Sequence, residues 1–371
     1  MRTILVNYTG RKGGGAAFAY EATKALIEKE QNIIAIVSEY AENLNLWKQL
    51  PLKKLIILRT YNNFLDFIPR TFLFLLIYIW RIKKDLKGFN IDYVYCPMIQ
   101  PWTIFINMLF KDAKKIVTVH DPEPHSGTRN FIFVYLANLC ARFSDELIVL
   151  SESFRELCAK KFNKSINNVH YIPHGDFSYY KRVQKKQKII NYPKDHVNFL
   201  FFGRISKYKG LNILSKAYSI VNRELNNVTL TVAGSGDFSE FEEDYKRLKN
   251  VRVLNRWFND DEVGSLFDGE NIIVVLPYLD ATQSGVIPIA IEYGVPIIAS
   301  NTGGLSQQIN HLETGILVEP KNPIALAEAM INLANNKELR ESLANEAKRR
   351  NEKNSWGEIV NKLLKVMSSN P

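Results

Sequence analysis

The sequence contains few cysteines and no long hydrophobic run. Only three of its 371 residues are cysteine, Cys96, Cys140 and Cys158, and none shows the C-x-x-C spacing of a metal or redox site. We therefore expect a reducing, cytoplasmic setting with no disulfide framework and no metal site. The longest uninterrupted apolar core, Phe72–Trp80, has nine residues, whereas a membrane-spanning helix needs about 20. The N-terminal residues also form too short an apolar run for a signal peptide.

Two signatures of common ligand-binding folds are incomplete or absent. Gly13–Gly15 follow an apolar segment and precede an alanine-rich one, but they lack the full G-x-G-x-x-G spacing. No acidic residue ends the next apolar segment, Ile33–Ser38, although Glu39 is close, so a nicotinamide-dependent oxidoreductase is a poor alternative.

The formal net charge of +10 favours acidic partners, namely nucleic acid, an anionic membrane or a phosphorylated substrate. No recognisable nucleic-acid module accompanies it, so we expect no nucleic-acid partner.

The apolar segments that are present alternate with helical or irregular stretches. With 46% hydrophobic and 23% charged residues, the chain has a globular composition and is long enough for two domains. The alternation predicts an α/β fold with parallel sheets covered by helices. The clearest predicted strands are Thr3–Tyr8, Leu55–Leu58, Ile91–Cys96, Lys115–His120, Glu146–Leu150, Val197–Phe202, Val228–Ala233 and Ile272–Leu276.

The most informative stretch runs from Asn271 to Gly304. It predicts a buried strand ending at Pro277, a small polar turn, a helix from about Val286 to Tyr293 and a second strand. In such a unit the turn lies at the carboxyl end of the first strand, where the N–H groups at the helix start bind phosphate. Glu292 is two helical turns past Ser284, so we expect it to face the same crevice; the alternative is an exposed helix residue.

A basic turn follows the predicted strand Val197–Phe202. Arg204 stands just past the strand end and Lys209 just before the next helix, so both side chains can reach one anion. The alternative is a solvated basic turn.

Together these motifs resemble the retaining glycosyltransferases of the glycogen-synthase-like family 4, also described as glycosyl transferases group 1. Their GT-B fold has two Rossmann-like domains facing a central cleft. The resemblance gives Glu292 the donor ribose and gives Arg204 and Lys209 the donor diphosphate. The family's first glutamate is replaced by Ser284, which leaves sugar selection open. The remaining donor-binding residues that the resemblance implies are Gly13, Gly14, Gly15, Gly234, Arg256, Trp257, Gln283, Gly285 and Val286.

Further candidates lie where the predicted strand Lys115–His120 ends. His120 comes at the strand tip, before a proline-rich loop, and the family has a sugar-contacting histidine at this point. We therefore expect an active-site role for His120, although a lone histidine is more often structural. His125, Arg129 and His174 are candidates for the acceptor side.

The segment from Phe64 to Ile82 is the most hydrophobic in the chain. Two interpretations remain open. It is either a buried core helix or an amphipathic element on the inner face of the plasma membrane, with Arg70, Arg81, Lys83 and Lys84 on lipid head groups.

We expect an N-terminal acceptor domain over residues 1–176, completed by a final helix in 355–371, a linker over 177–196 and a donor domain over 197–354. The expected function is metal-independent, retaining transfer from a nucleoside-diphosphate sugar to a saccharide or lipid-linked saccharide, with no cofactor. Bacterial surface polysaccharide (capsule, O-antigen or exopolysaccharide) is the expected setting. The alternative is a nucleotide or sugar-phosphate binding protein without transferase activity.

Overall fold

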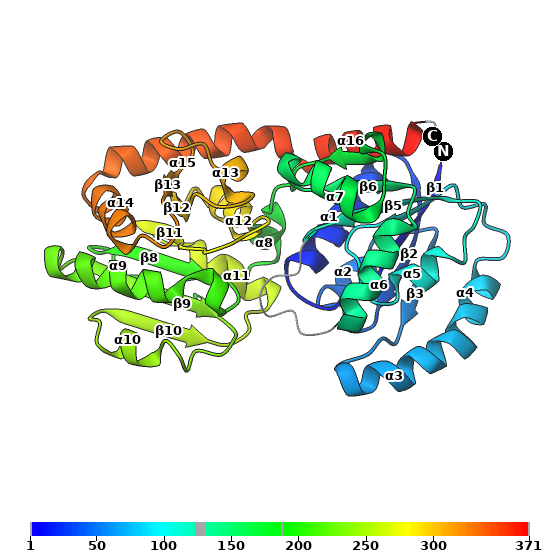
Figure 1. The fold of residues 1–371 in the computed structure, drawn as a ribbon, viewed down its shortest axis with the longest axis horizontal. Helices are drawn as coiled ribbons and strands as arrows, with labels where there is room; N and C mark the ends of the chain where they lie inside the picture. Colours follow the sequence, from blue (N-terminus) through cyan, green and yellow to red (C-terminus); the bar gives the residue numbers. More distant parts are fainter. Residues whose placement is uncertain (1, 123–130, 187, 370–371) are drawn as a thin grey trace. The chain divides into compact units, whose positions relative to one another are not determined.

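A computed structural model describes residues 2–122, 131–186 and 188–369 (Figure 1). The chain divides into two compact units. Unit 1 comprises Met1–Gly175 with Ser355–Pro371, and unit 2 comprises Asp176–Asn354.

Unit 1 contains a seven-stranded sheet in the order β3-β2-β1-β4-β5-β6-β7, in which every pairing is parallel. Its central strands are rich in Ile, Leu and Val and are buried on both faces, as a sheet covered by helices requires. The strands are β1 (Thr3–Tyr8), β2 (Asn32–Ser38), β3 (Lys54–Leu58), β4 (Tyr93–Cys96), β5 (Lys114–Val119), β6 (Glu146–Val149) and β7 (Val169–Tyr171). The helices and turns are α1 (Gly14–Glu28), α2 (Leu44–Trp47), α3 (Phe64–Leu73), η1 (Phe74–Tyr78), α4 (Ile79–Asp85), α5 (Thr103–Asn107), α6 (Phe131–Arg142), η2 (Glu152–Phe154), α7 (Arg155–Phe162), η3 (Ile166–Asn168) and α16 (Trp356–Ser368).

Unit 2 contains a six-stranded parallel sheet in the order β10-β9-β8-β11-β12-β13. The strands are β8 (Val197–Phe202), β9 (Val228–Gly234), β10 (Val251–Asn255), β11 (Ile272–Leu276), β12 (Ile297–Ser300) and β13 (Ile316–Val318). The helices and turns are α8 (Ser178–Val183), η4 (Lys207–Lys209), α9 (Leu211–Glu224), α10 (Glu242–Lys246), α11 (Asp260–Phe267), α12 (Val286–Glu292), α13 (Leu305–Gln308), α14 (Pro323–Asn335), α15 (Lys337–Asn351) and η5 (Glu352–Asn354).

Both sheets have the doubly wound strand order of a Rossmann-like domain. The order reverses between β1 and β4 in unit 1 and between β8 and β11 in unit 2. Ligands of such sheets bind at the carboxyl ends of the strands beside this reversal. The fold therefore predicts ligand sites in the loops after β1 and β4 and in the loops after β8 and β11.

The chain passes from unit 1 to unit 2 after Gly175 and returns to unit 1 at Ser355. Helix α16 returns to unit 1, where Trp356, Val360 and Leu363 are buried against α1 and the sheet. Residues 177–196, for which the sequence predicts a linker, belong to unit 2. There α8 buries Tyr179 and Tyr180, and the Tyr179 hydroxyl donates to Asp260 Oδ2 at 2.7 Å.

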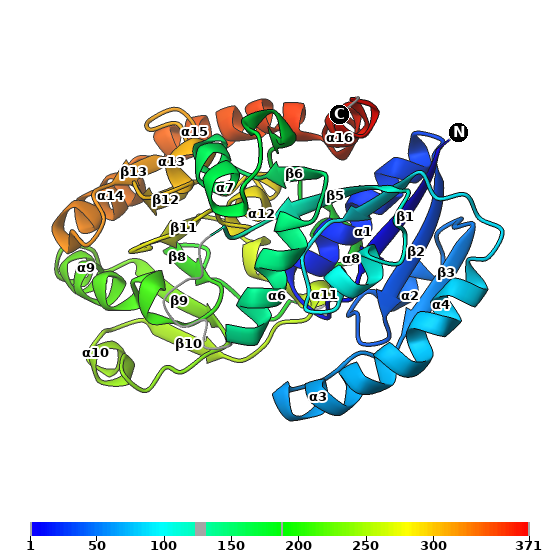
Figure 2. The same cartoon turned by 45° about the vertical axis from the view of Figure 1, so that its right-hand side comes forward.

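Helices α3 and α4 run along the outer edge of unit 1, on the side of β3, in both views (Figures 1 and 2). Among the described residues, no helix is both long enough and apolar enough to cross a membrane.

Candidate active site

The loops after β8 and β11 are packed directly against each other in unit 2. Gly210 follows the β8 loop with φ +71°, and a Cβ atom at this position would lie 1.8 Å from the Pro277 carbonyl oxygen. The Leu279 N–H donates to the Tyr208 carbonyl at 2.8 Å. Only glycine allows so close an approach, so the sequence SKYKG fixes the basic turn beside the loop after β11.

Lys209 is held in place by an aromatic ring. Its ammonium lies 3.5 Å from the ring centroid of Tyr278, which is the first residue after Pro277 and is completely buried. A second ring, that of Tyr208, lies 5.0 Å away. A cation over an aromatic face is attracted by the ring quadrupole, so Lys209 is oriented and does not belong to a freely solvated turn.

Arg204 differs from Lys209, because its side chain is exposed and makes no hydrogen bond or ion pair with another described residue. Ile205 pairs with Gly236 in the backbone, and Ile205 N–H donates to the Ser235 carbonyl at 3.0 Å, so the loop that carries Arg204 is anchored. This leaves an available guanidinium at the point where the strand order reverses, as an anion site requires.

The start of α12 offers fewer free N–H groups than the sequence predicts. The Ser284 N–H donates to Gln308 Oε1 at 2.8 Å, and the Val286 N–H donates to Ser284 Oγ at 3.3 Å. Ser284 is 3% exposed and its hydroxyl also lies 3.4 Å from the Tyr278 hydroxyl. Its hydroxyl is therefore buried and bonded to the backbone at the start of α12.

Two neighbouring groups in this turn remain suited to a ligand. The Gln283 Oε1 atom is enclosed and has no hydrogen-bond partner among the described residues. Asp280 exposes a carboxylate just after β11, with no ion pair to a described residue. Gln283 was predicted from the sequence and Asp280 was not, although Asp280 is the one acidic residue between Pro277 and Val286.

Glu292 lies at the C-terminal end of α12 and pairs with a lysine of α8. It is the last residue of the helix, six residues from Val286, and at 1.5 Å per residue this separates it from the helix start by roughly 9 Å. Its carboxylate forms an ion pair with Lys181 of α8 at 3.2 Å, and Lys181 also donates to the Glu292 carbonyl. Lys181 thus compensates the negative end of the helix dipole and the carboxylate together. The donor-ribose role of Glu292 therefore stays a prediction, and in this structure its carboxylate is engaged by Lys181.

The loop after β9 packs against the loop after β8. Gly234 has φ +148°, and a Cβ atom there would lie 1.7 Å from the Gly203 carbonyl oxygen. Arg256 follows β10, but its guanidinium is paired with Glu262 at 2.9 Å and lies 4.1 Å from the Phe258 ring centroid. Trp257 is 42% exposed. The two residues proposed for a base contact are about equally exposed, and Trp257 is the one that offers an aromatic ring.

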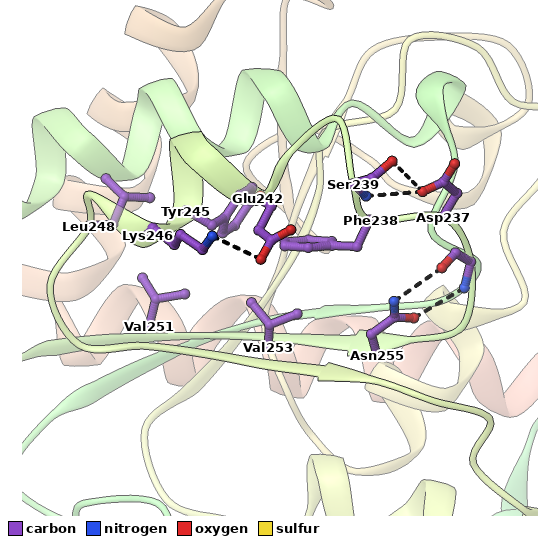
Figure 3. A pocket seen from close by; sticks show the side chains of 11 residues that line it. Asp237, Phe238, Ser239, Glu242, Tyr245, Lys246, Leu248, Val251, Val253 and Asn255 are labelled. Atoms are coloured by element: carbon purple, nitrogen blue, oxygen red, sulfur yellow. Dashed lines mark hydrogen bonds and ion pairs between the residues drawn. The ribbon is translucent and has the colours of Figure 1, made fainter.

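A cavity of about 670 Å³ lies beside the edge strand β10 and was not predicted from the sequence. Figure 3 shows Val251 and Val253 of β10 pointing toward Phe238 and Tyr245, while the Asn255 side chain exchanges two hydrogen bonds with the Gly236 backbone. The apolar alternation of β10 is the sequence signal that could have revealed an open face here.

Two histidines come together in unit 1. His120 follows β5, His174 follows β7, and their ring centroids are 6.4 Å apart, with Phe18 of α1 5.0 Å from each. His120 Nε2–H donates to the Pro97 carbonyl at 2.9 Å, and His174 Nδ1–H donates to the Gly175 carbonyl at 3.1 Å. Because a carbonyl only accepts, each ring keeps its other nitrogen as an acceptor when neutral.

Burial keeps both rings neutral. It is the main cause that lowers the pKa of His120, and it lowers the pKa of His174 to about 3, with the neighbouring His120 as the second cause. At neutral pH the pair can therefore accept hydrogen bonds from hydroxyl groups, but it offers no positive charge to a phosphate.

The glycine loop after β1 is also arranged differently from a phosphate loop. The Gly13 N–H donates to the Glu42 carboxylate at 3.3 Å, so a negative group of the protein already occupies this donor. Gly15 has no room for a side chain, since a Cβ atom would lie 2.2 Å from Met98 Sδ. Gly14 begins α1 and is exposed. The carboxylate favours a hydroxyl-bearing ligand over a second anion beside Gly13.

A second cavity, of about 310 Å³, lies near the carboxyl ends of β4 and β5 in unit 1. Polar lining comes from Gln100, Asp121, Asn138 and Lys161, and apolar lining includes Phe133. These residues were not predicted, because α6, α7 and two loops bring them together from distant parts of the chain. His125 and Arg129 lie outside the described residues.

Comparison with known proteins places this geometry in a family. Residues 182–350 match the model of glycosyl transferases group 1, and residues 12–175 match that of glycosyltransferase family 4. The chain belongs to these glycosyltransferases. It is 28% identical over 236 residues to an uncharacterized glycosyltransferase of Methanocaldococcus jannaschii, covering 60% of each chain. It is 25% identical over 261 residues to the capsular polysaccharide biosynthesis glycosyltransferase CapM of Staphylococcus aureus, covering 66% of this chain and 67% of that one.

The chain spans about half the length of the curated relatives it matches, with 44% to 60% of the first three covered. Among solved structures, Anabaena HepE in complex with UDP and glucose superposes with a TM-score of 0.72 at 15% identity, covering 100% of both chains. This likeness confirms the two-domain, Rossmann-like GT-B fold. The two family models fall on the two units, so His120 and His174 belong to one match, and Arg204 and Lys209 to the other.

Proposed function

We propose that this glycosyltransferase moves a sugar from a nucleoside-diphosphate sugar to a saccharide or lipid-linked saccharide, with retention of anomeric configuration and without a metal ion or cofactor. The observation that carries the proposal is the pair Arg204 and Lys209 in unit 2. One is an available guanidinium and the other an ammonium oriented on the Tyr278 ring, and both follow β8 at the reversal of strand order. A diphosphate is the group that this charge and geometry fit.

The chemistry follows from the position of the charge. As the bond between the anomeric carbon and the phosphate oxygen breaks, the nucleoside diphosphate departs with the electron pair and its negative charge grows. Arg204 and Lys209 stabilise that charge, which lowers the barrier in the transition state. The acceptor oxygen then bonds to the anomeric carbon from the face that the diphosphate leaves, and the acceptor proton passes to the departing phosphate oxygen.

The histidine pair of unit 1 suits the neutral part of the reaction. His120 and His174 carry acceptor nitrogens and stay uncharged at neutral pH. We assign them to hydroxyl groups of the transferred sugar or the acceptor. Glu42 at Gly13 supports the same assignment, because a carboxylate accepts hydrogen bonds from hydroxyls and repels phosphate.

A specific observation supports a second candidate function, that of a nucleotide or sugar-phosphate binding protein without transferase activity. The Ser284 hydroxyl accepts from the Val286 N–H and the Glu292 carboxylate pairs with Lys181, so both groups are engaged within the protein. Under the first candidate, Asp280 is the carboxylate left in this turn to contact the transferred sugar.

The proposed setting is bacterial surface polysaccharide synthesis, such as capsule, O-antigen or exopolysaccharide, which the similarity to a capsular enzyme supports. A lipid-linked acceptor would place the enzyme at the cytoplasmic face of an anionic membrane.

The test is a thermal-shift panel of the full chain with UDP, GDP, CDP and their sugar conjugates, compared among wild type, Arg204→Ala and the matched control Arg223→Ala. Arg223 is exposed on α9 and makes no ion pair with a described residue. We expect one nucleoside diphosphate to stabilise the wild type and the control but not Arg204→Ala.

Product analysis then separates the two candidate functions. With the donor identified by the panel, the anomeric configuration of the product is read by NMR in the presence of a chelator. A product of unchanged configuration supports retaining, metal-independent transfer. Nucleotide binding without product over a broad acceptor set favours the binding protein, and no shift with any nucleotide rejects the donor site.

A further inference from the structure

The helix formed by α3, η1 and α4 has two apolar faces, and unit 1 covers only one of them. On the inner face Phe67, Phe74 and Ile82 are buried, and Phe74 stacks on Trp102 at 4.6 Å between centroids. The Trp102 indole N–H donates to Thr71 Oγ1 at 2.8 Å, which fixes the rotation of the helix on the domain. The outer face is therefore a defined surface of a well-anchored element.

That outer face is strongly hydrophobic. Leu65, Phe72, Leu76 and Trp80 follow at intervals of seven, four and four residues, which places them along one side of the helix. Their exposed fractions are 84%, 67%, 62% and 63%, and Ile68 beside them is 63% exposed. A contiguous row of large exposed apolar residues on one helix face marks an interaction site.

Positive charge follows the apolar row at its C-terminal end. Lys83, Lys84 and Lys87 are exposed, and the Lys84 ammonium lies 5.1 Å from the Trp80 ring centroid. The two acidic residues of the helix are neutralised within it, since Asp66 pairs with Arg70 and Asp85 with Arg81. The three lysines thus give the surface an uncompensated positive charge.

At its N-terminal end the inner side of this helix is covered by α6. Phe133 of α6 packs on Phe67 of α3 with centroids 4.8 Å apart, so the two helices are neighbours there. This contact adds to the anchoring of the helix on unit 1.

We propose that this surface, the exposed face of Leu65–Lys87, binds the head-group region of an anionic lipid bilayer. The outer residues combine Leu, Phe and Trp with flanking lysines, which is the composition of a helix that lies in a membrane interface. A second copy of this chain carries the same net charge of +10, which disfavours it as the occupant relative to an anionic surface. The inference deepens the proposed function, because it would bring the enzyme to a lipid-linked acceptor, but lipid binding itself requires no glycosyl transfer.

The experiment is co-sedimentation of the full chain with vesicles of equal parts phosphatidylglycerol and phosphatidylcholine, and with vesicles of phosphatidylcholine alone, without nucleotide or sugar. Two variants alter the surface. One is Leu65→Ser, Phe72→Ser and Leu76→Ser together, and the other is Lys83→Gln, Lys84→Gln and Lys87→Gln together. Their controls are Met108→Ser, an equally exposed residue of unit 1, and the lysine set Lys216→Gln, Lys249→Gln and Lys353→Gln.

We expect the wild type and both controls to bind the anionic vesicles and to bind phosphatidylcholine much more weakly. The three lysine substitutions should weaken binding by about a hundredfold, at about fivefold for each lysine. The three serine substitutions should weaken it by at least about tenfold at every salt concentration. Nucleotide-induced thermal shifts should stay unchanged in both variants, since the altered residues are exposed on unit 1.

Three results would overturn the proposal: no binding of the wild type to anionic vesicles, equal binding by the serine variant, or loss of binding with both control sets as well. Lipid-independent dimerisation that the serine variant abolishes would assign the surface to a second copy instead. None of these outcomes affects glycosyl transfer to a water-soluble acceptor. Lipid binding by this surface can therefore be rejected while the proposed transferase activity is retained, and the reverse is also true.

Discussion

The contact between Lys209 and Tyr278 leads to a prediction about donor binding that does not require knowledge of the sugar. Tyr278 is completely buried and its ring lies 3.5 Å beneath the Lys209 ammonium, so the lysine is ordered before any ligand arrives. A lysine that is already ordered loses less side-chain entropy when it binds phosphate. Immobilising such a side chain costs about 0.5–1.5 kcal/mol, so Tyr278→Leu should raise the Kd of the nucleoside diphosphate roughly three- to tenfold.

Tyr278→Phe provides the matched comparison. It keeps the ring and removes only the hydroxyl, whose contact with Ser284 Oγ is 3.4 Å long and therefore weak. We expect this variant to bind the nucleotide within about twofold of the wild type, since a weak contact contributes under 1 kcal/mol.

The assay is calorimetric titration of the full chain with the nucleotide identified by thermal shift, as a double-mutant cycle with Lys209→Ala. If Tyr278 acts through Lys209, Tyr278→Leu should add almost nothing to the effect of Lys209→Ala. Equal losses from Tyr278→Leu in both backgrounds would refute the reasoning, as would a Tyr278→Phe variant as impaired as Tyr278→Leu.

Three further predictions concern single groups. Gly210→Ala should lower the free energy of unfolding by more than about 2 kcal/mol, because it adds a clash with Pro277 to the strain of φ +71°. Gly294→Ala, with φ +67° and no atom within 4 Å of the new Cβ, should cost only about 1 kcal/mol in the same denaturant titration, and equal costs would contradict the clash. The pKa of His174 is about 3 in the folded protein and about 6.5 when unfolded, so the unfolded state takes up the proton first and stability falls as pH drops below 6.5. That loss should reach about 2 kcal/mol between pH 7 and pH 5 and be absent in His174→Gln, so a pH-independent difference between the two proteins would contradict it. Lys181→Met should destabilise unit 2 while leaving nucleotide Kd unchanged, since Lys181 compensates Glu292 at the C-terminal end of α12; a weakened Kd with unchanged stability would return Glu292 to the donor site.

Much of the fold could be predicted because buried parallel strands leave a clear pattern. Val197–Phe202 and Ile272–Leu276 were predicted with the bounds that β8 and β11 have in the structure. These two segments are almost entirely apolar and have sharp polar, glycine or proline boundaries, so local sequence determines them.

The site was only partly predictable, because its decisive contacts are distant in sequence. Lys209 was predicted to bind an anion, but the ring that orients it comes from Tyr278 on another loop. Glu292 was assigned from helical spacing, yet a lysine of α8 captures its carboxylate. No local pattern contains either contact.

The segments 177–196 and Phe64–Ile82 show the same limit. The first is basic and lacks an apolar period, but Tyr179 and Tyr180 are enough to bury α8 in unit 2. The second left two interpretations open from sequence, a buried helix or an amphipathic surface. The structure gives it both a buried face and an exposed apolar face, because the helix lies at the edge of unit 1 (Figure 1), which covers it on one side.

The most direct test of the central claim is a crystal structure of the full chain grown with the nucleoside diphosphate that gives the largest thermal shift. We predict a diphosphate within hydrogen-bond distance of both Arg204 and Lys209, with Lys209 still over the Tyr278 ring. A diphosphate bound instead at Gly13–Gly15 in unit 1, or one that contacts neither cation, would contradict the account.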